Sequence, residues 1–228
     1  MDNIGKIFKL LISINWISIY INFKYLPFKQ AIRFPILFFG PVSIHSLKGQ
    51  VILPERLWPG MVRVGEGKVG IFEKRLKSVL DINGTLTFKG ETRIGHGCGI
   101  SVGENSLLEF GEMFKITAKS SIISTGGKKI VFGTGCLLSW DVLIMNTDFH
   151  PIYTSSDNAR INYPADIIIG DNVWFGCRST VLKNTTIASN SIIAANANVN
   201  KSLLLENCIY AGTPAKCVKD GVNWKWFE

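Results

Sequence analysis

A repeat of six residues between positions 169 and 217 constrains the fold of this chain more than any other feature. Every sixth residue is apolar, and small or aliphatic residues form a second series offset by four positions. A period of six fits neither the 3.6-residue helix nor a long alternating strand. It predicts a solenoid of short strands and tight corners, three hexads to a triangular coil. The first series is Ile169, Phe175, Val181, Ile187, Ile193, Val199, Leu205, Ala211 and Cys217; the second is Val173, Ser179, Thr185, Ser191, Ala197, Leu203, Ile209 and Ala215.

The residues at the expected corners fit this interpretation. Asn and Gly tolerate the backbone angles that tight turns need. Successive coils would stack as parallel strands roughly 4.8 Å apart. The corner residues are Asn172, Asn184, Asn190, Asn196 and Gly176.

Two motifs in this stretch resemble the hexapeptide-repeat acyltransferases. Residues 169–176 read Ile-Gly-Asp-Asn-Val-Trp-Phe-Gly, like the family's most recognisable turn, and residues 211–216 read Ala-Gly-Thr-Pro-Ala-Lys, like its closing motif. Residues 23–30 are similar to the N-terminal segment of bacterial capsule and O-antigen O-acetyltransferases. The resemblance implies an all-β fold, a left-handed parallel β-helix. A purely structural β-helix without activity is the alternative, because a fold alone does not define a function.

The repeat is less regular before residue 132. Apolar residues keep the hexad spacing for short stretches, and the phase then slips by two. Such slips predict bulges or short corner insertions. The successive runs are Ile82, Phe88, Ile94, Ile100; Val102, Leu108, Phe114; Ile116, Ile122; and Phe132, Leu138, Ile144.

Residues 1–50 are predicted as an apolar and basic extension, short and helical, before a β-helix over 51–217 and a cap over 218–228. The uncharged runs 10–23 and 34–47 are shorter than the ~20 apolar residues that a spanning helix needs, and no cleavage site of a signal peptide follows the first. Two interpretations fit: a cap packed on the β-helix, or an interfacial membrane anchor. The predicted apolar helix face is Ile4, Ile7, Phe8, Leu11, Ile12, Trp16 and Ile19.

The net charge limits the classes of binding partner, and the cysteine and histidine content limits the cellular compartment and the expected metal sites. The net charge is +8, and six Lys and Arg residues stand against Asp2 in residues 1–50. A basic chain suits nucleic acid, anionic lipid or a phosphorylated ligand, but no nucleic-acid-binding motif is present. The five Cys residues (Cys98, Cys136, Cys177, Cys208 and Cys217) lack CxxC spacing, which predicts reduced thiols and a cytoplasmic location. With three His and no Cys/His cluster, we expect no metal site.

The hexad pattern disappears in residues 145–166, where we place the active-site loop. A solenoid can turn in a few residues, and long loops in compact domains are usually functional. The loop holds His150, followed by Pro151, and the resemblance implies that this histidine is the catalytic base. Imidazole, with an ordinary pKa near 6.5, is well suited to accept a proton near neutral pH. Asp148 or Asp141 could orient the imidazole, and either could equally be a solvated carboxylate.

The resemblance also implies acetyl-CoA as the acyl donor. Trp174 corresponds to an aromatic residue that lines the groove in relatives, and the backbone N–H of Cys177, after Gly176, to the donor that polarises the thioester carbonyl. Ala194 and Ala195 would lie beside the pantetheine arm, and Lys201 and Lys216 would contact phosphates or simply face solvent. Arg160 and Asn162 are acceptor contacts or ordinary surface residues.

These expectations together predict an O-acetyltransferase that acts on a sugar hydroxyl of a cell-surface polysaccharide or a lipid-linked precursor. N-acetylation of an amino-sugar nucleotide is the closest rival. A homotrimer is expected, since flat prism faces pack around a threefold axis and relatives place each active site between two prisms. The expected location is cytoplasmic, with the inner face of the plasma membrane as a docking surface if residues 1–50 bind lipid.

Overall fold

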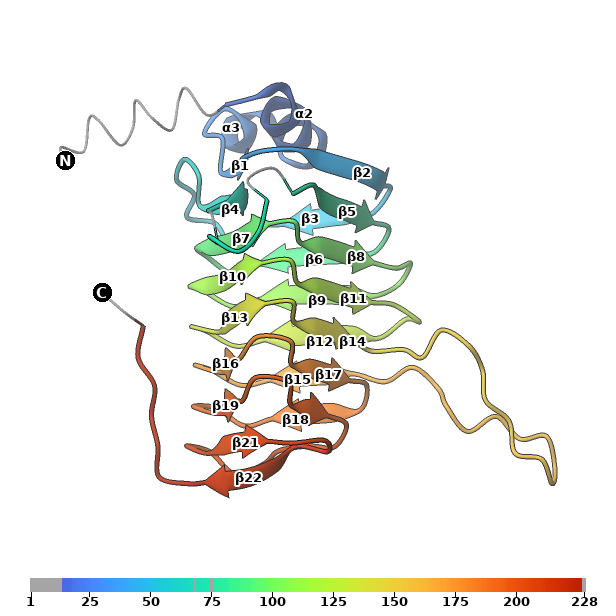
Figure 1. Cartoon of the computed structure of the whole chain (residues 1–228). Coiled ribbons are helices and arrows are strands. Elements are labelled where there is room, and N and C mark those ends of the chain that lie inside the picture. Colours follow the sequence, from blue (N-terminus) through green and yellow to red (C-terminus); the bar gives the residue numbers. More distant parts are fainter. Residues whose placement is uncertain (1–13, 68, 74–75, 227–228) are drawn as a thin grey trace.

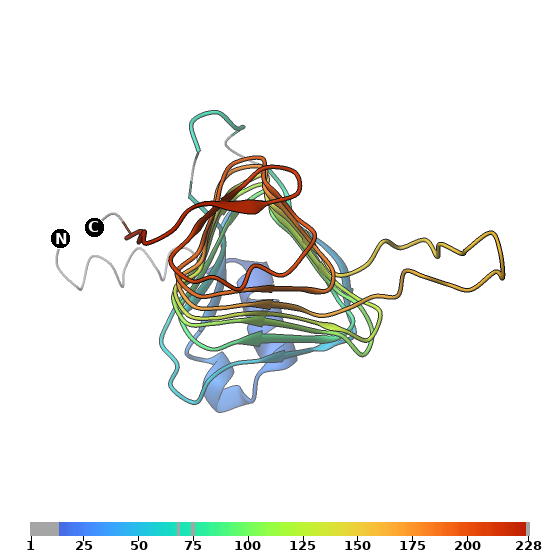
Figure 2. The same cartoon turned by 90° about the horizontal axis from the view of Figure 1, so that it is seen from below.

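The strands form a triangular prism of three sheets, shown from the side in Figure 1 and along the axis in Figure 2. The computed structural model describes residues 14–67, 69–73 and 76–226. The chain visits the three sheets in turn, so each coil up to β18 adds one strand to each sheet. In the next coil, sheet C is continued among the described residues only by the isolated bridge between Ile187 and Leu203. This arrangement confirms the predicted parallel β-helix.

The three sheets, named A, B and C, are parallel except at one end, where β22 runs antiparallel to β21. In the described residues, sheet A contains β1 (Ile36–Phe38), β4 (Val62–Glu66), β7 (Thr92–His96), β10 (Phe114–Ala118), β13 (Leu137–Trp140), β16 (Trp174–Phe175), β19 (Ile192–Ile193), β21 (Ile209–Ala211) and β22 (Lys216–Lys219). Sheet B contains β2 (Val42–Leu47), β5 (Ser78–Ile82), β8 (Gly99–Val102), β11 (Ser121–Ser124), β14 (Leu143–Met145), β17 (Thr180–Leu182) and β20 (Asn198–Val199). Sheet C contains β3 (Gln50–Ile52), β6 (Thr85–Phe88), β9 (Leu107–Phe110), β12 (Lys129–Phe132), β15 (Ile167–Ile169) and β18 (Thr185–Ile187).

The predicted hexads after the loop form the core of the later coils. Ile169, Phe175, Val181, Ile187, Ile193 and Val199 are all buried. The predicted corner asparagines, 172, 184, 190 and 196, all have positive φ, and Arg178 takes the same conformation at the one corner of this series without Asn. The prediction fails at the end of the series, where Leu205 is 51% exposed and Cys217 lies on exposed β22. There Tyr210, not Ala211, takes the buried position beside Ile193.

The bulges and insertions expected from the phase slips are wrong for the coils between β6 and β14. Ile100 and Val102 both lie buried on β8, and Phe114 and Ile116 both lie buried on β10. Alternate residues of a strand share a face, so a slip of two marks a longer strand with two inward positions. Coils here are accordingly 22 residues long, as the partners Leu86 and Leu108 show, whereas after the loop the partners Ile167 and Thr185 are 18 apart.

The coils begin earlier than the predicted boundary at residue 50. Strands β1, β2 and β3 form the first coil, and α2 (Trp16–Tyr25) and α3 (Phe28–Ala31) cover its open end (Figure 1). The edge of β1 is closed by a side chain of α2, because the Asn22 amide donates to Ile36 O at 2.7 Å and accepts from Ile36 N at 3.2 Å. An open strand edge would otherwise invite pairing with another chain.

The predicted apolar face of the N-terminal helix is not the packed face. Ile17 and Ile21 are buried, whereas Trp16 is 69% and Ile19 46% exposed. The residues of the predicted face between 4 and 12 lie outside the described residues. Within the described part of the chain, no helix is long and apolar enough to cross a membrane.

The expectation of reduced cysteines is wrong for one pair. Cys208 and Cys217 form a disulfide, because β22 folds back along β21 and brings together two thiols that no short motif had linked. Cys98 and Cys136 are free thiols, and burial raises the pKa of each to about 12. At such a pKa neither forms the reactive thiolate near neutral pH.

Candidate functional site

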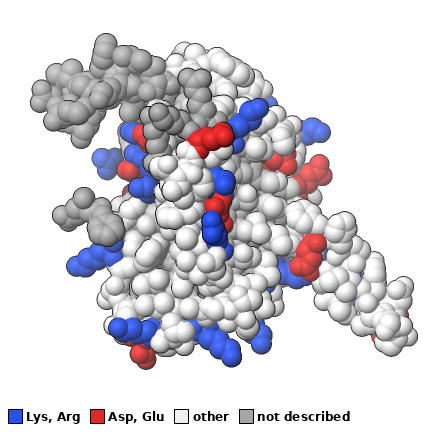
Figure 3. Space-filling view, viewed as in Figure 1, with Lys and Arg blue, Asp and Glu red and all other residues white. Residues whose placement is uncertain are grey.

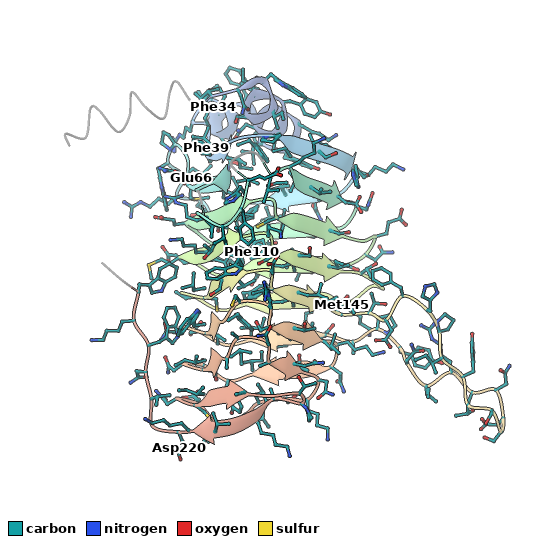
Figure 4. All side chains as sticks on the ribbon, viewed as in Figure 1. Phe34, Phe39, Glu66, Phe110, Met145 and Asp220 are labelled. Carbon is teal, nitrogen blue, oxygen red and sulfur yellow. A yellow bond between two sulfur atoms is a disulfide. The ribbon has the colours of Figure 1, made fainter. Side chains whose placement is uncertain are left out.

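The predicted break in the repeat is a projecting arm. Residues 146–166 leave the prism between β14 and β15, at the edge where sheets B and C meet, and extend into solvent (Figures 1 and 2). Met145 marks its root in Figure 4. The arm is a hairpin, since Ile161 N donates to Ile152 O at 2.9 Å and Thr154 N donates to Ala159 O at 2.9 Å.

His150 lies on the first half of the arm, and its side chain is exposed. Its backbone is fixed on two sides. The N–H donates to Asp148 O at 2.7 Å, and the carbonyl accepts from the Asn162 amide at 2.8 Å. The arrangement therefore holds the chain at His150 while leaving the imidazole free to meet a substrate.

Asp148 does not orient the imidazole in this structure. Its carboxylate accepts from the Asn162 amide at 2.8 Å and pairs with Lys183 Nζ. The hydrogen bond from Lys183, followed by that from Asn162, lowers the pKa of Asp148. Asp148, Asn162 and Lys183 form what we call the arm clasp, which ties the arm to the corner after β17.

Asn162, predicted as an acceptor contact or an ordinary surface residue, is 8% exposed. Its side-chain oxygen Oδ1 also accepts from Ile152 N at 2.5 Å, so its side chain is used inside the arm. The sequence gives no signal for Lys183, because it is one of several lysines in corners and its partner is 35 residues away. Arg160 donates to Asn162 O at 3.3 Å and lies 4.9 Å from the centre of the Tyr163 ring.

Asp141, the second predicted partner of the imidazole, lies at a different edge of the prism. It follows β13 at the edge between sheets A and B and forms an ion pair with Lys119 at 3.3 Å. The arm is rooted at the edge between sheets B and C. The structure therefore does not bring Asp141 to His150 within one chain.

The residues predicted to meet the thioester gather at that A–B edge. Cys177 follows β16 there, and Ala194 and Ala195 occupy the equivalent corner one coil further on, where Asn196 N donates to Cys177 O at 3.0 Å. A side chain on Gly176 would approach the backbone N of Ala195 to 2.6 Å, so the coils need glycine here. Among the described residues, no acceptor is found for the backbone N–H of Cys177, which leaves this donor available to a ligand.

Trp174 lies on the outer side of sheet A. Its indole N–H donates to Ser139 Oγ at 3.2 Å, and its ring centre lies 6.0 Å from that of Trp224. Trp224 belongs to the C-terminal tail, which was expected to cover the last coil. Instead β22 covers that coil, and after Asp220 (Figure 4) the tail turns back along the prism (Figure 1).

The two predicted phosphate contacts are both exposed but lie apart. Lys201 follows β20 of sheet B, and Lys216 begins β22 of sheet A. Lys and Arg side chains gather at the end of the molecule that β22 forms (Figure 3). A positive end of this kind attracts phosphate groups.

Comparisons with known proteins agree with this geometry. The family model for the bacterial transferase hexapeptide (six repeats) matches residues 166–201. The chain is 42% identical over 96 residues to a polysialic acid O-acetyltransferase of Neisseria meningitidis, which covers 42% of this chain and 45% of that protein. It is 30% identical over 95 residues to a polysialic acid O-acetyltransferase of Escherichia coli O1:K1 / APEC, which covers 42% of this chain and 31% of that protein.

Among solved structures, the polySia specific acetyltransferase NeuO superposes with a TM-score of 0.54 at 22% identity, covering 84% of this chain and 90% of that one. This similarity concerns the fold, the left-handed parallel β-helix. The resemblance to hexapeptide-repeat transferases is thereby confirmed, directly over residues 166–201. The chain spans less than half the length of the two curated relatives.

Proposed function

We propose that this protein transfers an acetyl group from acetyl-CoA to a hydroxyl of a cell-surface polysaccharide or its precursor. The observation that carries the proposal is His150, whose exposed imidazole sits on an arm with a fixed backbone. The two relatives named polysialic acid O-acetyltransferase support the same class of reaction.

In the proposed reaction, the His150 imidazole takes the proton of the sugar hydroxyl as its oxygen attacks the thioester carbonyl. The free N–H of Cys177 stabilises the oxyanion that develops. The carbon–sulfur bond then breaks, the ester forms, and the imidazolium returns its proton to the departing thiolate. Lys201 and Lys216 would hold phosphates of the co-substrate, while Trp174 would line the acceptor side.

One chain alone does not complete this site. His150 is rooted at the B–C edge and Cys177 lies at the A–B edge. We infer a homotrimer in which the arm of one subunit reaches the A–B edge of the next. The exposed apolar residues of the arm, among them Ile161 and Tyr163, would be covered in that assembly.

The reaction is tested by incubating the purified protein with labelled acetyl-CoA and candidate glycans. We expect label in the glycan that mild base removes, since esters yield and amides persist. Base-stable label would instead identify the N-acetyltransferase. An absence of acetyl-CoA binding by calorimetry would identify a structural β-helix.

We further propose that the N-terminal helices hold the enzyme at the cytoplasmic face of the membrane. Trp16, Ile19, Tyr20 and Phe23 form an exposed stripe along α2, and Lys24, Lys29 and Arg33 are exposed beside it. Aromatic residues with neighbouring basic side chains suit an anionic interface. Co-sedimentation with anionic vesicles should weaken as the salt concentration rises. If the protein binds neither neutral nor anionic vesicles, the helices serve only as a cap on the β-helix.

A further inference from the structure

We propose that the outer face of sheet A, on the N-terminal side of Trp174, is a groove that binds a segment of an acidic acceptor glycan. This inference rests on the proposed function. It identifies the surface that holds the chain of sugars whose terminal or internal hydroxyl is acetylated. The surface is formed by four features: a register column, two adjoining cavities, the C-terminal tail and one uncompensated lysine.

The register of sheet A places Trp174 at the end of a column of outward side chains. Its neighbours in successive coils are Leu137, Lys115, Arg93 and Arg63. Neighbouring strands lie about 4.8 Å apart, so the column extends about 19 Å from Trp174. A straight track of this length accommodates several sugar rings in a row.

Two cavities of about 470 and 420 Å³ lie along this column and share Arg93 and Lys115 in their walls. Gly95 and Thr117 also line the second cavity, and Gly95 adds no side chain to its wall. Because the two cavities share Arg93 and Lys115, they form one groove along the column.

The C-terminal tail supplies the aromatic wall of the groove. The Trp224 indole N–H donates to Asn172 O at 2.8 Å, which anchors the tail to the edge between sheets C and A. The ring centres of Trp224 and Trp226 are 5.9 Å apart. The Trp226 ring lines the larger cavity, and its centre lies 5.7 Å from Lys115 Nζ. Indole rings offer flat apolar faces with a polar N–H, a surface on which the C–H face of a sugar ring packs.

The charges of the groove favour an acidic glycan. Arg63 pairs with Glu66 at 3.0 Å and Arg93 pairs with Glu91 at 2.8 Å. Among the described residues, no carboxylate lies within 4.0 Å of Lys115. One cation of the column is thus left for a carboxylate of the ligand.

The position of the groove argues for the acceptor and against the co-substrate. The residues proposed for acetyl-CoA, Cys177, Ala195 and Lys216, lie on the A–B edge and in the coils that follow Trp174. The groove lies in the coils that precede Trp174. Donor and acceptor would therefore approach the reacting centre from opposite ends of the prism.

The test compares Trp226→Ala and Lys115→Gln with wild type on short and long sialic acid oligomers, with Leu204→Ala as control. Leu204 is 73% exposed and follows β20, outside the groove. For the wild type and the control, we expect KM to fall as the oligomer lengthens. Each groove variant should raise KM for the long oligomer about 3–10-fold, as expected for losing one aromatic or charged contact, with kcat and the KM for acetyl-CoA unchanged.

Binding is measured separately by tryptophan fluorescence, so that the groove is tested even if no acetyl transfer occurs. Quenching by the long acidic oligomer, weaker in Trp226→Ala and absent with a neutral glucan of equal length, would support the groove. Equal affinity of wild type and Trp226→Ala, or equal binding of the neutral glucan, would overturn the proposal. A lower oligomeric mass of Trp226→Ala would also overturn it, because a second copy of the chain would then occupy this face.

Discussion

At the scale of single residues, His150 is held by its backbone rather than by its ring. Both hydrogen bonds at this position involve main-chain atoms, to Asp148 and Asn162. We therefore expect His150→Asn to retain the fold and the affinity for acetyl-CoA. Loss of general-base assistance should lower turnover by about 10²–10⁴-fold. Steady-state kinetics with calorimetry of acetyl-CoA binding checks this, and near-normal turnover would rule out His150 as the base.

The arm clasp should be insensitive to pH in the neutral range. Lys183 and then Asn162 hold the pKa of Asp148 below its ordinary value. Because the pKa of Asp148 is lower in the folded chain than in the unfolded chain, the clasp contributes its full stability at any pH above the unfolded pKa. This contribution is lost only as the pH falls through the lower pKa of the folded chain. Between about pH 5 and pH 8, protease resistance of the arm should thus stay constant. A loss of resistance within this range would show that the Asp148 carboxylate does not hold the arm.

Lys183 should act on catalysis only through the arm. The ion pair with Asp148 is partly exposed, with side chains 19% and 34% accessible, and such pairs contribute about 0–1 kcal/mol. Lys183→Met should accordingly lower kcat roughly 2–5-fold and speed proteolysis of the arm, with the KM for acetyl-CoA unchanged. The charge exchange Lys183→Asp with Asp148→Lys should recover part of the loss. No recovery, with unchanged proteolysis, would show that the pair does not hold the arm.

At the scale of elements, the early coils are held together by a column of aromatic rings. Phe110 is fully buried, and its ring centre lies 5.6 Å from those of Phe88 and Phe132. Phe110→Ala should lower the free energy of unfolding by about 3–5 kcal/mol, since a rigid stack cannot close around the cavity. Ile71→Ala, at a 68% exposed site, should change it by less than about 0.5 kcal/mol. Denaturant unfolding compares the two; similar losses would contradict this account of the core.

The elements also show what a sequence can and cannot predict. Hexads such as Ile169 and Phe175 repeat because one inward residue per short strand is a local requirement, and the pattern predicts them. The longer strands of the early coils carry two inward residues, so Ile100 and Val102 looked like a change of phase. The Lys183–Asp148 pair and the Cys208–Cys217 disulfide depend on how distant corners meet. No periodicity carries that information.

At the scale of the whole molecule, the separation of His150 from the A–B edge has a direct consequence for assembly. An arm that carries exposed Phe149, Tyr153 and Tyr163 into solvent leaves apolar surface that a neighbouring subunit would cover. Sedimentation should give the mass of three chains. Tyr163→Asp, which places a charge in that contact, should weaken the trimer and the activity together. A stable, active monomer would contradict the assembly.

Subunit complementation tests whether the trimer shares its sites. If each site takes His150 from one chain and Trp174 from the next, His150→Asn and Trp174→Ala chains should each show little activity alone. Mixed trimers would contain some sites with an intact histidine beside an intact tryptophan, because the two defects fall on opposite sides of each interface. Unfolding and refolding the two variants together should then restore activity, whereas mixing them after separate refolding should not. If one chain supplied both residues, no mixture would regain activity, and the arm would have to fold back on its own prism.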